Sequence, residues 1–215
     1  MSDASELAQD RARALKLVPV SHETAERLDL FVNIFLRWQS AVQLVAPSTL
    51  KTIWTRHIAD SLQLIEHAPD ARVWADLGSG GGFPGLMIAM ALAERGDAMV
   101  HLIESDSRKA AFLREAARLT QAPAKVHNDR IESVAKQIGK VDVVTARALA
   151  PMPKLIELAM PFLEGDIPGI FLKGQYVDSE LTEAAKYRRV QFKVLPSRTD
   201  PGGKVVILKC APADR

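Results

Sequence analysis

The ten residues from Asp76 to Gly85 constrain the fold of this chain more than any other segment. They read DLGSGGGFPG and contain five of the twelve glycines. An apolar, strand-like run (Val73–Leu77) leads into them and an apolar helical pattern follows. Clustered glycines let the backbone turn tightly and let a ligand approach the main chain. The segment therefore predicts a strand, a ligand-holding turn and a helix, in that order.

After Arg72, short runs of Val, Ile and Leu alternate with longer helical patterns, which predicts an α/β fold. The expected strands are Val73–Leu77, Met99–Glu104, Ala124–His127, Val141–Ala146, Gly169–Lys173, Gln191–Leu195 and Lys204–Lys209. The expected helices are Gly85–Arg95, Ser107–Thr120, Ile131–Gln137, Pro153–Phe162 and Asp178–Tyr187. Such alternation is typical of a mostly parallel sheet with helices on both faces. The last two strands are joined only by Pro196–Gly203, which is too short for a parallel crossover, so we expect one antiparallel strand.

Residues 1–70 are expected to form a helical extension packed on a Rossmann-like domain of residues 71–215. Ser21 is a candidate N-cap for one amphipathic helix, and a second helical pattern follows Pro47. The apolar positions of these two patterns are Leu28, Phe31, Val32, Phe35 and Val42, then Leu50, Ile53, Trp54, Ile58, Leu62 and Ile65.

Bulk properties favour a soluble cytoplasmic protein. The single cysteine, Cys210, excludes an intramolecular disulfide. The longest apolar run, Leu86–Ala93, is far shorter than the roughly 18 residues of a membrane span. The net charge of +2 neither requires nor excludes a nucleic-acid partner. We expect a monomer with no membrane partner. The histidines show no metal-ligand spacing, so we expect no metal.

Two cofactors can be considered for the glycine loop. Gly80, Gly82 and Gly85 satisfy the dinucleotide motif G-x-G-x-x-G, which is weak alone. Asp76, two residues before Gly78, would repel a pyrophosphate but suits the ammonium and sulfonium groups of S-adenosylmethionine. The spacing D-x-G-x-G-x-G, with Gly78 and Gly80 beneath the cofactor, is common in methyltransferases. A glycine-rich turn without a ligand is the remaining alternative.

The ends of the next two strands support a nucleoside cofactor. Glu104 ends the second predicted strand, where a carboxylate can accept hydrogen bonds from ribose hydroxyls. Ile131 and Glu132 follow the third strand, where an adenine ring would lie. For Glu104 the plainer alternative is a surface carboxylate at a strand end, and the spacing alone does not prove the roles of Ile131 and Glu132.

Several ordered motifs together resemble one known family, the small-subunit ribosomal RNA methyltransferase G family, also called glucose-inhibited division protein B. The resemblance covers most of the chain and implies a class I S-adenosylmethionine methyltransferase fold. The matching segments are Asp76–Ala89, Ile53–Leu62, Ile103–Glu115, Arg130–Glu132, Thr145–Ala148 and Leu172–Gly174. The sequence departs from the family at two places. Gln43 begins the segment Gln43–Val45, where family members usually have an asparagine, and Gly81 replaces a common alanine or proline.

The resemblance implies methyl transfer from S-adenosylmethionine to N7 of guanine 527, in the 530 loop of 16S ribosomal RNA. It implies cofactor contacts from Gly78, Phe83, Ile131, Glu132 and Arg147. The RNA partner would be 16S rRNA or the small ribosomal subunit. The alternatives are a methyltransferase for a small molecule or protein, a nicotinamide dehydrogenase, and a non-catalytic RNA-binding assembly factor.

Four basic side chains are candidate catalytic residues. Arg147 and Lys173 end the fourth and fifth strands, at the sheet edge where ligands of open α/β sheets bind. Arg147 would hold the cofactor, an RNA phosphate or the guanine edge; an ion pair with Asp76 or Glu132 is the alternative. Arg56 and His57 lie beside Asp60 and Ser61 on one helix, so these residues form either an RNA contact or a cluster of capping groups and ion pairs. A serine-hydrolase triad is excluded, because one helix turn supplies neither a nucleophile elbow nor an oxyanion loop.

Three basic clusters are candidates for holding the RNA backbone, of which we expect one to do so. Charged helix faces are usually only solvated. The clusters are Arg11, Arg13 and Lys16; Arg108, Lys109, Arg114 and Arg118; and Lys186, Arg188 and Arg189.

Overall fold

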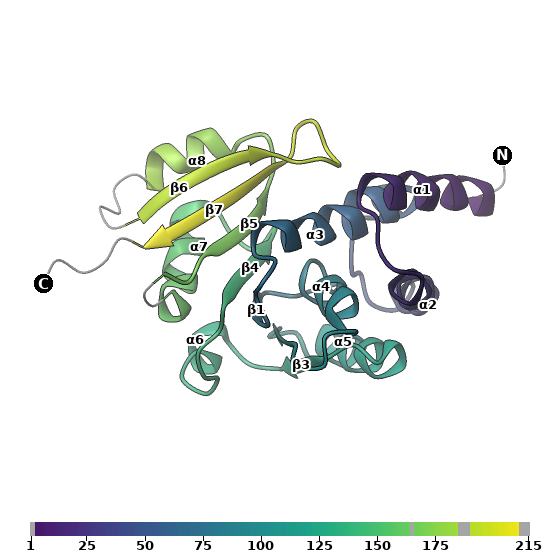
Figure 1. Ribbon diagram of the computed structural model, residues 1–215, viewed down its shortest axis with the longest axis horizontal. Coiled ribbons are helices and arrows are strands. Elements are labelled where there is room, and N and C mark those ends of the chain that lie inside the picture. Colours follow the sequence, from purple (N-terminus) through teal and green to yellow (C-terminus); the bar gives the residue numbers. More distant parts are fainter. Residues whose placement is uncertain (1–2, 164–165, 185–189, 211–215) are drawn as a thin grey trace, which may run out of the picture.

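The computed structural model describes residues 3–163, 166–184 and 190–210 of the chain. Its centre is a seven-stranded sheet with the strand order β3-β2-β1-β4-β5-β7-β6 (Figure 1). The strands are β1 (Val73–Leu77), β2 (Met99–Ile103), β3 (Ala124–His127), β4 (Val143–Arg147), β5 (Gly169–Lys173), β6 (Val190–Pro196) and β7 (Lys204–Cys210).

The sheet confirms the expected topology. The pairings from β3 through β5 are all parallel, and β7 is antiparallel to both β5 and β6. A dinucleotide-binding Rossmann sheet has the strand order 3-2-1-4-5-6. The antiparallel β7, inserted between β5 and β6, therefore argues against the dehydrogenase alternative.

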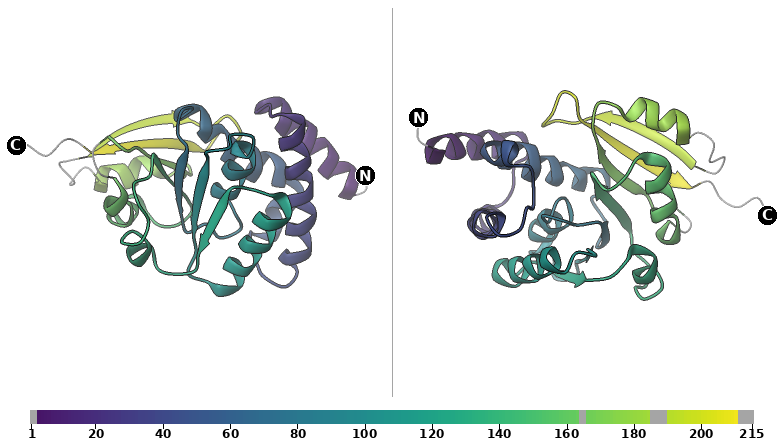
Figure 2. Two further views of the ribbon diagram at one scale, coloured as in Figure 1. Left: turned by 60° about the horizontal axis from the view of Figure 1, so that its bottom comes forward. Right: turned by 180° about the vertical axis from the view of Figure 1, so that it is seen from behind.

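Each face of the sheet has its own hydrophobic core. On one face, Trp74, Val100 and Ile170 pack with α4 (Gly85–Leu92) and α5 (Ser107–Thr120). On the opposite face, Leu77 and Phe171 pack with helices from the second half of the chain. Those helices are α6 (Ile131–Val134), α7 (Met152–Ala159) with the short 3-10 turn η4 (Met160–Phe162), and α8 (Val177–Ala184). Figure 2 shows the helices on both sides of the strands.

The N-terminal helices belong to the first of these cores. The long helix α2 (His22–Gln39) begins at Ser21, whose hydroxyl accepts a hydrogen bond from the Thr24 amide, as expected for an N-cap. Phe31 and Phe35 on α2 lie against Phe83 of the glycine loop and Phe112 of α5, with ring centroids 5.6–6.1 Å apart. This aromatic cluster joins the N-terminal segment to the edge of the sheet that carries the glycine loop.

The second N-terminal helical pattern is less regular than expected. It consists of η1 (Pro47–Thr52), the π-helix η2 (Trp54–Ala59), α3 (Asp60–Leu62) and η3 (Gln63–His67). Helix α1 (Asp3–Leu17) holds η2 through Asp10, a buried carboxylate that accepts hydrogen bonds from the backbone amides of Trp54 and Thr55 and from the Thr55 hydroxyl. The wide π turn thus has partners for two of its first amides.

Several predicted boundaries change. The expected strand Val141–Ala146 is β4, which runs from Val143 to Arg147; Asp142 before it accepts the amides of Arg72 and Val73 through its side chain. The expected helix Ile131–Gln137 is confined to α6. The expected helix Asp178–Tyr187 begins at Val177, and its last residues lie outside the described part of the chain. In the described residues, no helix has the length and apolar character needed to cross a membrane.

Candidate functional site

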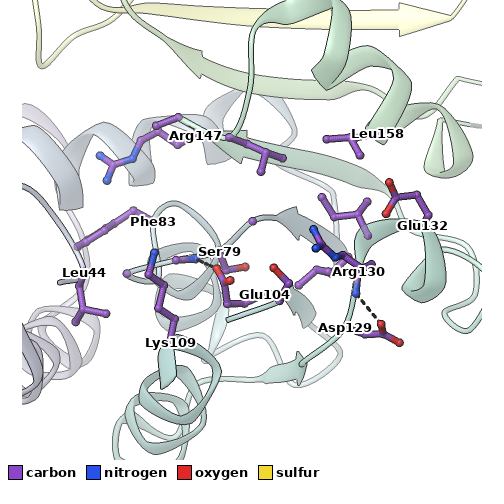
Figure 3. Close-up of a pocket in the computed structure, with 18 of the residues that line it drawn as sticks. Leu44, Ser79, Phe83, Glu104, Lys109, Asp129, Arg130, Glu132, Arg147 and Leu158 are labelled. Carbon is purple, nitrogen blue, oxygen red and sulfur yellow. Dashed lines mark hydrogen bonds between the residues drawn. The ribbon is translucent and has the colours of Figure 1, made fainter. Parts of the chain in front are cut away.

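The carboxyl ends of β1, β2 and β4 meet at the glycine loop and bound a cavity of about 520 Å³. Its wall includes seven of the eight residues expected to bind a cofactor. They are Gly78, Gly80, Phe83, Glu104, Ile131, Glu132 and Arg147. Figure 3 shows Leu44, Phe83 and Arg147 at one end of this cavity, and Glu132 and Leu158 at the other.

The glycine loop needs glycine at Gly78, where φ is 68°. A Cβ at this position would lie 2.6 Å from Cδ1 of Leu149, which also lines the cavity. Left-handed backbone is costly for residues with a Cβ. Gly78 therefore fits the loop both by its conformation and by its lack of a side chain.

Asp76, the eighth expected cofactor residue, lies behind the loop and is fully buried. Its carboxylate accepts hydrogen bonds from the Gly85 amide (3.1 Å) and the Thr145 hydroxyl (3.0 Å). Burial raises the pKa of Asp76 to about 6, although these hydrogen bonds oppose the shift. The structure thus shows Asp76 fastening the loop to α4 and β4, whereas cofactor contact stays a prediction.

Glu104 lies on the cavity wall and holds the glycine loop through its carboxylate. Its Oε2 accepts a hydrogen bond from the Gly80 amide (2.9 Å), and its Oε1 accepts one from the Asp106 amide (2.7 Å). Each carboxylate oxygen has two acceptor directions. Glu104 can therefore also accept hydrogen bonds from two vicinal hydroxyls of a bound nucleoside.

A second cavity, of about 440 Å³, adjoins the first. Leu44, Arg147 and Ala148 line both cavities, so these residues form a shared wall. All four candidate catalytic residues lie on the wall of the second cavity. They are Arg56, His57, Arg147 and Lys173.

Arg147, Phe83 and His57 are stacked where the two cavities meet. The Arg147 guanidinium carbon lies 4.9 Å from the centroid of the Phe83 ring, and the His57 ring lies 5.0 Å from the same centroid. Arg147 also donates a hydrogen bond to the carbonyl of Arg56 (3.2 Å) and forms no ion pair with Asp76 or Glu132. Burial lowers the pKa of Arg147 to about 10, so it remains a cation at pH 7.

His57 is neutral in this setting. Burial, followed by the charges of Arg147 and Arg56, lowers its pKa to about 3. Its Nε2 lies 2.8 Å from the Thr49 hydroxyl, and its buried Nδ1 has no hydrogen-bond partner among the described residues. His57 is therefore an uncharged ring with one free polar atom.

The other two basic residues are held by carboxylates. Arg56 forms an ion pair with Asp200 in the β6–β7 loop (2.6 Å), which agrees with the alternative of capping groups and ion pairs and leaves RNA contact untested. Lys173 pairs with Glu180 of α8 and donates a hydrogen bond to the Ala150 carbonyl. Both cations are thus paired with carboxylates that line the same cavity.

The sequence analysis did not single out two features of this wall. Ala148 has φ of 51°, an unusual conformation for a residue with a Cβ, and no sequence pattern predicts it. Asp60 lines the second cavity, whereas the sequence pattern placed it beside Arg56 and His57 without assigning it a role of its own. Its position on a cavity becomes visible only when the β6–β7 loop is placed beside η2.

The basic clusters have different surroundings. Arg11 pairs with Asp29 and Arg13 with Asp10, whereas Lys109 lies on the wall of the first cavity. The third cluster, Lys186, Arg188 and Arg189, lies outside the described residues.

Comparisons with solved structures show the fold class. The O-methyltransferase from Bacillus cereus in complex with SAH superimposes with a TM-score of 0.61 at 15% identity, covering 97% of this chain and 100% of that chain. The ribosomal protein L11 methylase from Lactobacillus delbrueckii subsp. bulgaricus gives 0.58 at 18% identity, covering 73% and 79%. The chain has the Rossmann-like fold of class I S-adenosylmethionine methyltransferases.

Comparisons of sequence identify the family. The model for rRNA small subunit methyltransferase G matches residues 24–200. A protein named ribosomal RNA small subunit methyltransferase G from Bradyrhizobium sp. (strain BTAi1) is 55% identical over 95% of this chain and 92% of its own length. The protein of the same name from Methylobacterium radiotolerans is 53% identical over 92% and 93%. The chain therefore belongs to the rRNA small subunit methyltransferase G family.

Proposed function

We propose that this chain is a cytoplasmic enzyme that transfers the methyl group of S-adenosylmethionine to N7 of guanine 527, in the 530 loop of 16S ribosomal RNA. Family membership supports a ribosomal RNA methyltransferase that uses S-adenosylmethionine. The observation that carries the proposal is the pair of cavities that share the wall of Leu44, Arg147 and Ala148. A methyl donor in the first cavity and a base in the second would meet at this wall.

The first cavity fits the cofactor. The glycine loop leaves the main chain open at Gly78 and Gly80, and Glu104 offers acceptors suited to ribose hydroxyls. Ile131 and Glu132 would flank the adenine. When bound, the cofactor supplies an electrophilic methyl group on a positively charged sulfur.

The second cavity suits attack by N7 because this reaction needs no general base. Guanine N7 carries a lone pair and no proton. It forms the new N–C bond as the S–C bond breaks, so positive charge moves from sulfur to the purine. The task of the protein is alignment, which can lower a barrier by roughly 7–11 kcal/mol in well-oriented cases. The neutral ring of His57 agrees with a site that moves no proton.

Arg147 would position the RNA or the cofactor rather than react. It lies between the cavities and stays charged at pH 7. A bidentate grip on O6 and N7 would block methylation, so contact with an RNA phosphate or the cofactor carboxylate fits better. Lys173, Arg56 and His57 would shape the cavity from its sides.

The test is to map modified nucleotides by mass spectrometry in 16S RNA from cells with and without this chain. We expect loss of one 7-methylguanosine at position 527 when the chain is absent. Purified protein with labelled S-adenosylmethionine should methylate small subunits from the deletion strain. Labelling of a protein or metabolite in place of RNA would contradict the proposal, as would an unchanged nucleotide map.

A further inference from the structure

The Asp60 carboxylate has one oxygen fully used and one oxygen available. Its Oδ1 accepts three hydrogen bonds, from Gln63 Nε2 (2.7 Å), the Ser197 hydroxyl (2.9 Å) and the Thr199 hydroxyl (2.7 Å). Within the described residues, no hydrogen bond reaches Oδ2. Asp60 also lines the second cavity. The three donors therefore fix the carboxylate and leave Oδ2 as a free acceptor.

Asp60 differs in this respect from the other carboxylates of the cavity. Asp200 is paired with Arg56, and Glu180 is paired with Lys173 and also accepts the Met152 amide. No Lys, Arg or His of the described residues lies within ion-pair distance of Asp60. Burial raises the pKa of Asp60, and the Arg147 charge partly offsets that rise. Because partly buried carboxylates are costly without partners, the free Oδ2 is poised for a ligand that donates hydrogen bonds.

The purine edges indicate which ligand this acceptor suits. The Watson–Crick edge of guanine carries two neighbouring donors, N1–H and the N2 amino group, whereas adenine has an acceptor at N1. An ionised carboxylate can only accept hydrogen bonds, so it would attract the guanine edge and repel the N1 lone pair of adenine. N7 lies on the opposite side of the purine. A guanine held by its Watson–Crick edge therefore leaves N7 free to face the first cavity.

We propose that Asp60 Oδ2 binds the Watson–Crick edge of the target guanine through N1–H and N2–H and thereby selects guanine over other purines. This inference rests on the proposed function and assigns the residue that reads the acceptor base.

The same contact would assist the reaction as well as recognition. Methylation at N7 makes the purine cationic, in a cavity that already contains the cations Arg56, Arg147 and Lys173. N1–H and N2–H become stronger donors as this charge develops. A fixed carboxylate at that edge stabilises the transition state more than the neutral base, because it needs no reorganisation.

The substitution Asp60→Asn isolates this role. The three donors at Oδ1 require an acceptor there, so the asparagine carbonyl takes that position and its amino group replaces Oδ2. The link to the β6–β7 loop is thus retained, while the atom facing the base changes from acceptor to donor. Thermal unfolding and binding of labelled S-adenosylmethionine should be near those of the unchanged protein.

The experiment compares small subunits reconstituted with 16S RNA that carries guanosine or inosine at position 527. Inosine lacks only the N2 amino group. For the unchanged protein, we expect kcat/KM to be about 10- to 100-fold lower on inosine, as for loss of a hydrogen bond to a charged group. In Asp60→Asn, kcat/KM on guanosine should fall by a similar factor, and the ratio between the two substrates should approach one. Asp200→Asn, the same change in the same cavity, should keep the preference for guanosine.

The outcomes separate the inference from the function on which it rests. If the unchanged protein methylates guanosine subunits at N7 but Asp60→Asn keeps the same guanosine preference, the assignment of Asp60 is overturned and the proposed function stands. If the unchanged protein methylates guanosine and inosine subunits at equal rates, the assignment of Asp60 is overturned without testing any variant. No methylation of guanosine subunits by the unchanged protein overturns the proposed function itself.

Discussion

At the scale of single residues, Gly78 combines a left-handed backbone with a crowded Cβ position. With φ at 68°, an added Cβ would lie 2.6 Å from Leu149 Cδ1. We expect Gly78→Ala to lower the free energy of unfolding by about 1–2 kcal/mol, the usual cost of left-handed backbone with a Cβ. It should also weaken cofactor binding, because Leu149 must move on the cavity wall. Urea unfolding and equilibrium binding of labelled S-adenosylmethionine measure the two effects.

The matched control is Gly96→Ala. Nothing lies within 4 Å of a Cβ at Gly96, and its φ is outside the left-handed range. This variant should bind the cofactor as the unchanged protein does. Equal cofactor affinity in Gly78→Ala would mean that the loop does not hold the ligand.

Two histidines on neighbouring strands give a second prediction at this scale. His101 Nδ1 lies 2.9 Å from His127 Nε2. Burial lowers the pKa of His101 from 6.5 to about 4, with the His127 charge second, and burial also lowers the pKa of His127. Between pH 6.5 and about 4 the unfolded chain binds protons that the folded chain does not bind. The free energy of unfolding should therefore fall as the pH decreases through this range.

In the double variant His101→Asn/His127→Asn, the free energy of unfolding should fall less as the pH decreases. Urea unfolding at pH 7.5 and pH 5 measures the difference in each protein. His22→Asn, which removes an exposed histidine at the start of α2, controls for the loss of an imidazole. An unchanged difference between the two pH values in the double variant would show that the pair does not resist protonation.

At the scale of elements, the β6–β7 loop is held against η2 and α3 by side-chain hydroxyls. Ser197 and Thr199 both donate to Asp60 Oδ1. We expect Ser197→Ala/Thr199→Ala to lower the free energy of unfolding by about 1–3 kcal/mol, since net hydrogen bonds contribute about 0.5–1.5 kcal/mol each. The loss should also slow methyl transfer while leaving cofactor binding near normal, because the loop borders the second cavity and not the first. Chemical denaturation and single-turnover kinetics measure these effects.

Thr182→Ala provides the control for that double variant. The exposed Thr182 hydroxyl donates only to the carbonyl of Asp178 in its own helix. Its removal should change neither stability nor rate appreciably. If the loop variant lost cofactor affinity as strongly as rate, the two cavities would not be separable in the way the structure indicates.

The elements also show what the sequence can predict. Strand positions and the N-cap at Ser21 follow from local patterns, because buried parallel strands and capping residues have local signatures. The π-helix η2 could not be predicted in this way, since the spacing of its apolar residues also fits an ordinary α-helix. Helix α1 was not delimited because its sequence is largely polar. Asp76 was expected to face the cofactor, yet its buried position depends on how Gly85 and Thr145 approach it.

At the scale of the whole molecule, the second cavity is assembled from segments far apart in the chain. His57 precedes Arg147 by ninety residues, and Asp200 lies a further fifty-three along. The candidate residues could each be proposed from a strand end or a family motif. Their meeting in one cavity could not, because it depends on the N-terminal helices packing on the same core as α4 and α5. The second cavity therefore requires that the helical segment and the sheet fold together.

This dependence predicts a single cooperative unfolding transition for the N-terminal helices and the sheet. Phe31 and Phe35 share a core with Leu86 and Phe112, so neither part can open without exposing the apolar surface of the other. Hydrogen exchange followed by mass spectrometry at increasing urea should give the same opening free energy for the slowest amides of α2 and β4.

Asp10→Ala, which removes the buried acceptor of the η2 amides, should lower the opening free energies of α2 and β4 equally. Asp29→Ala, which removes only a half-exposed partner of Arg11, should lower them less. Loss of protection in α2 alone would show that the helical segment opens as a separate unit, and the second cavity would then form only when that segment is docked.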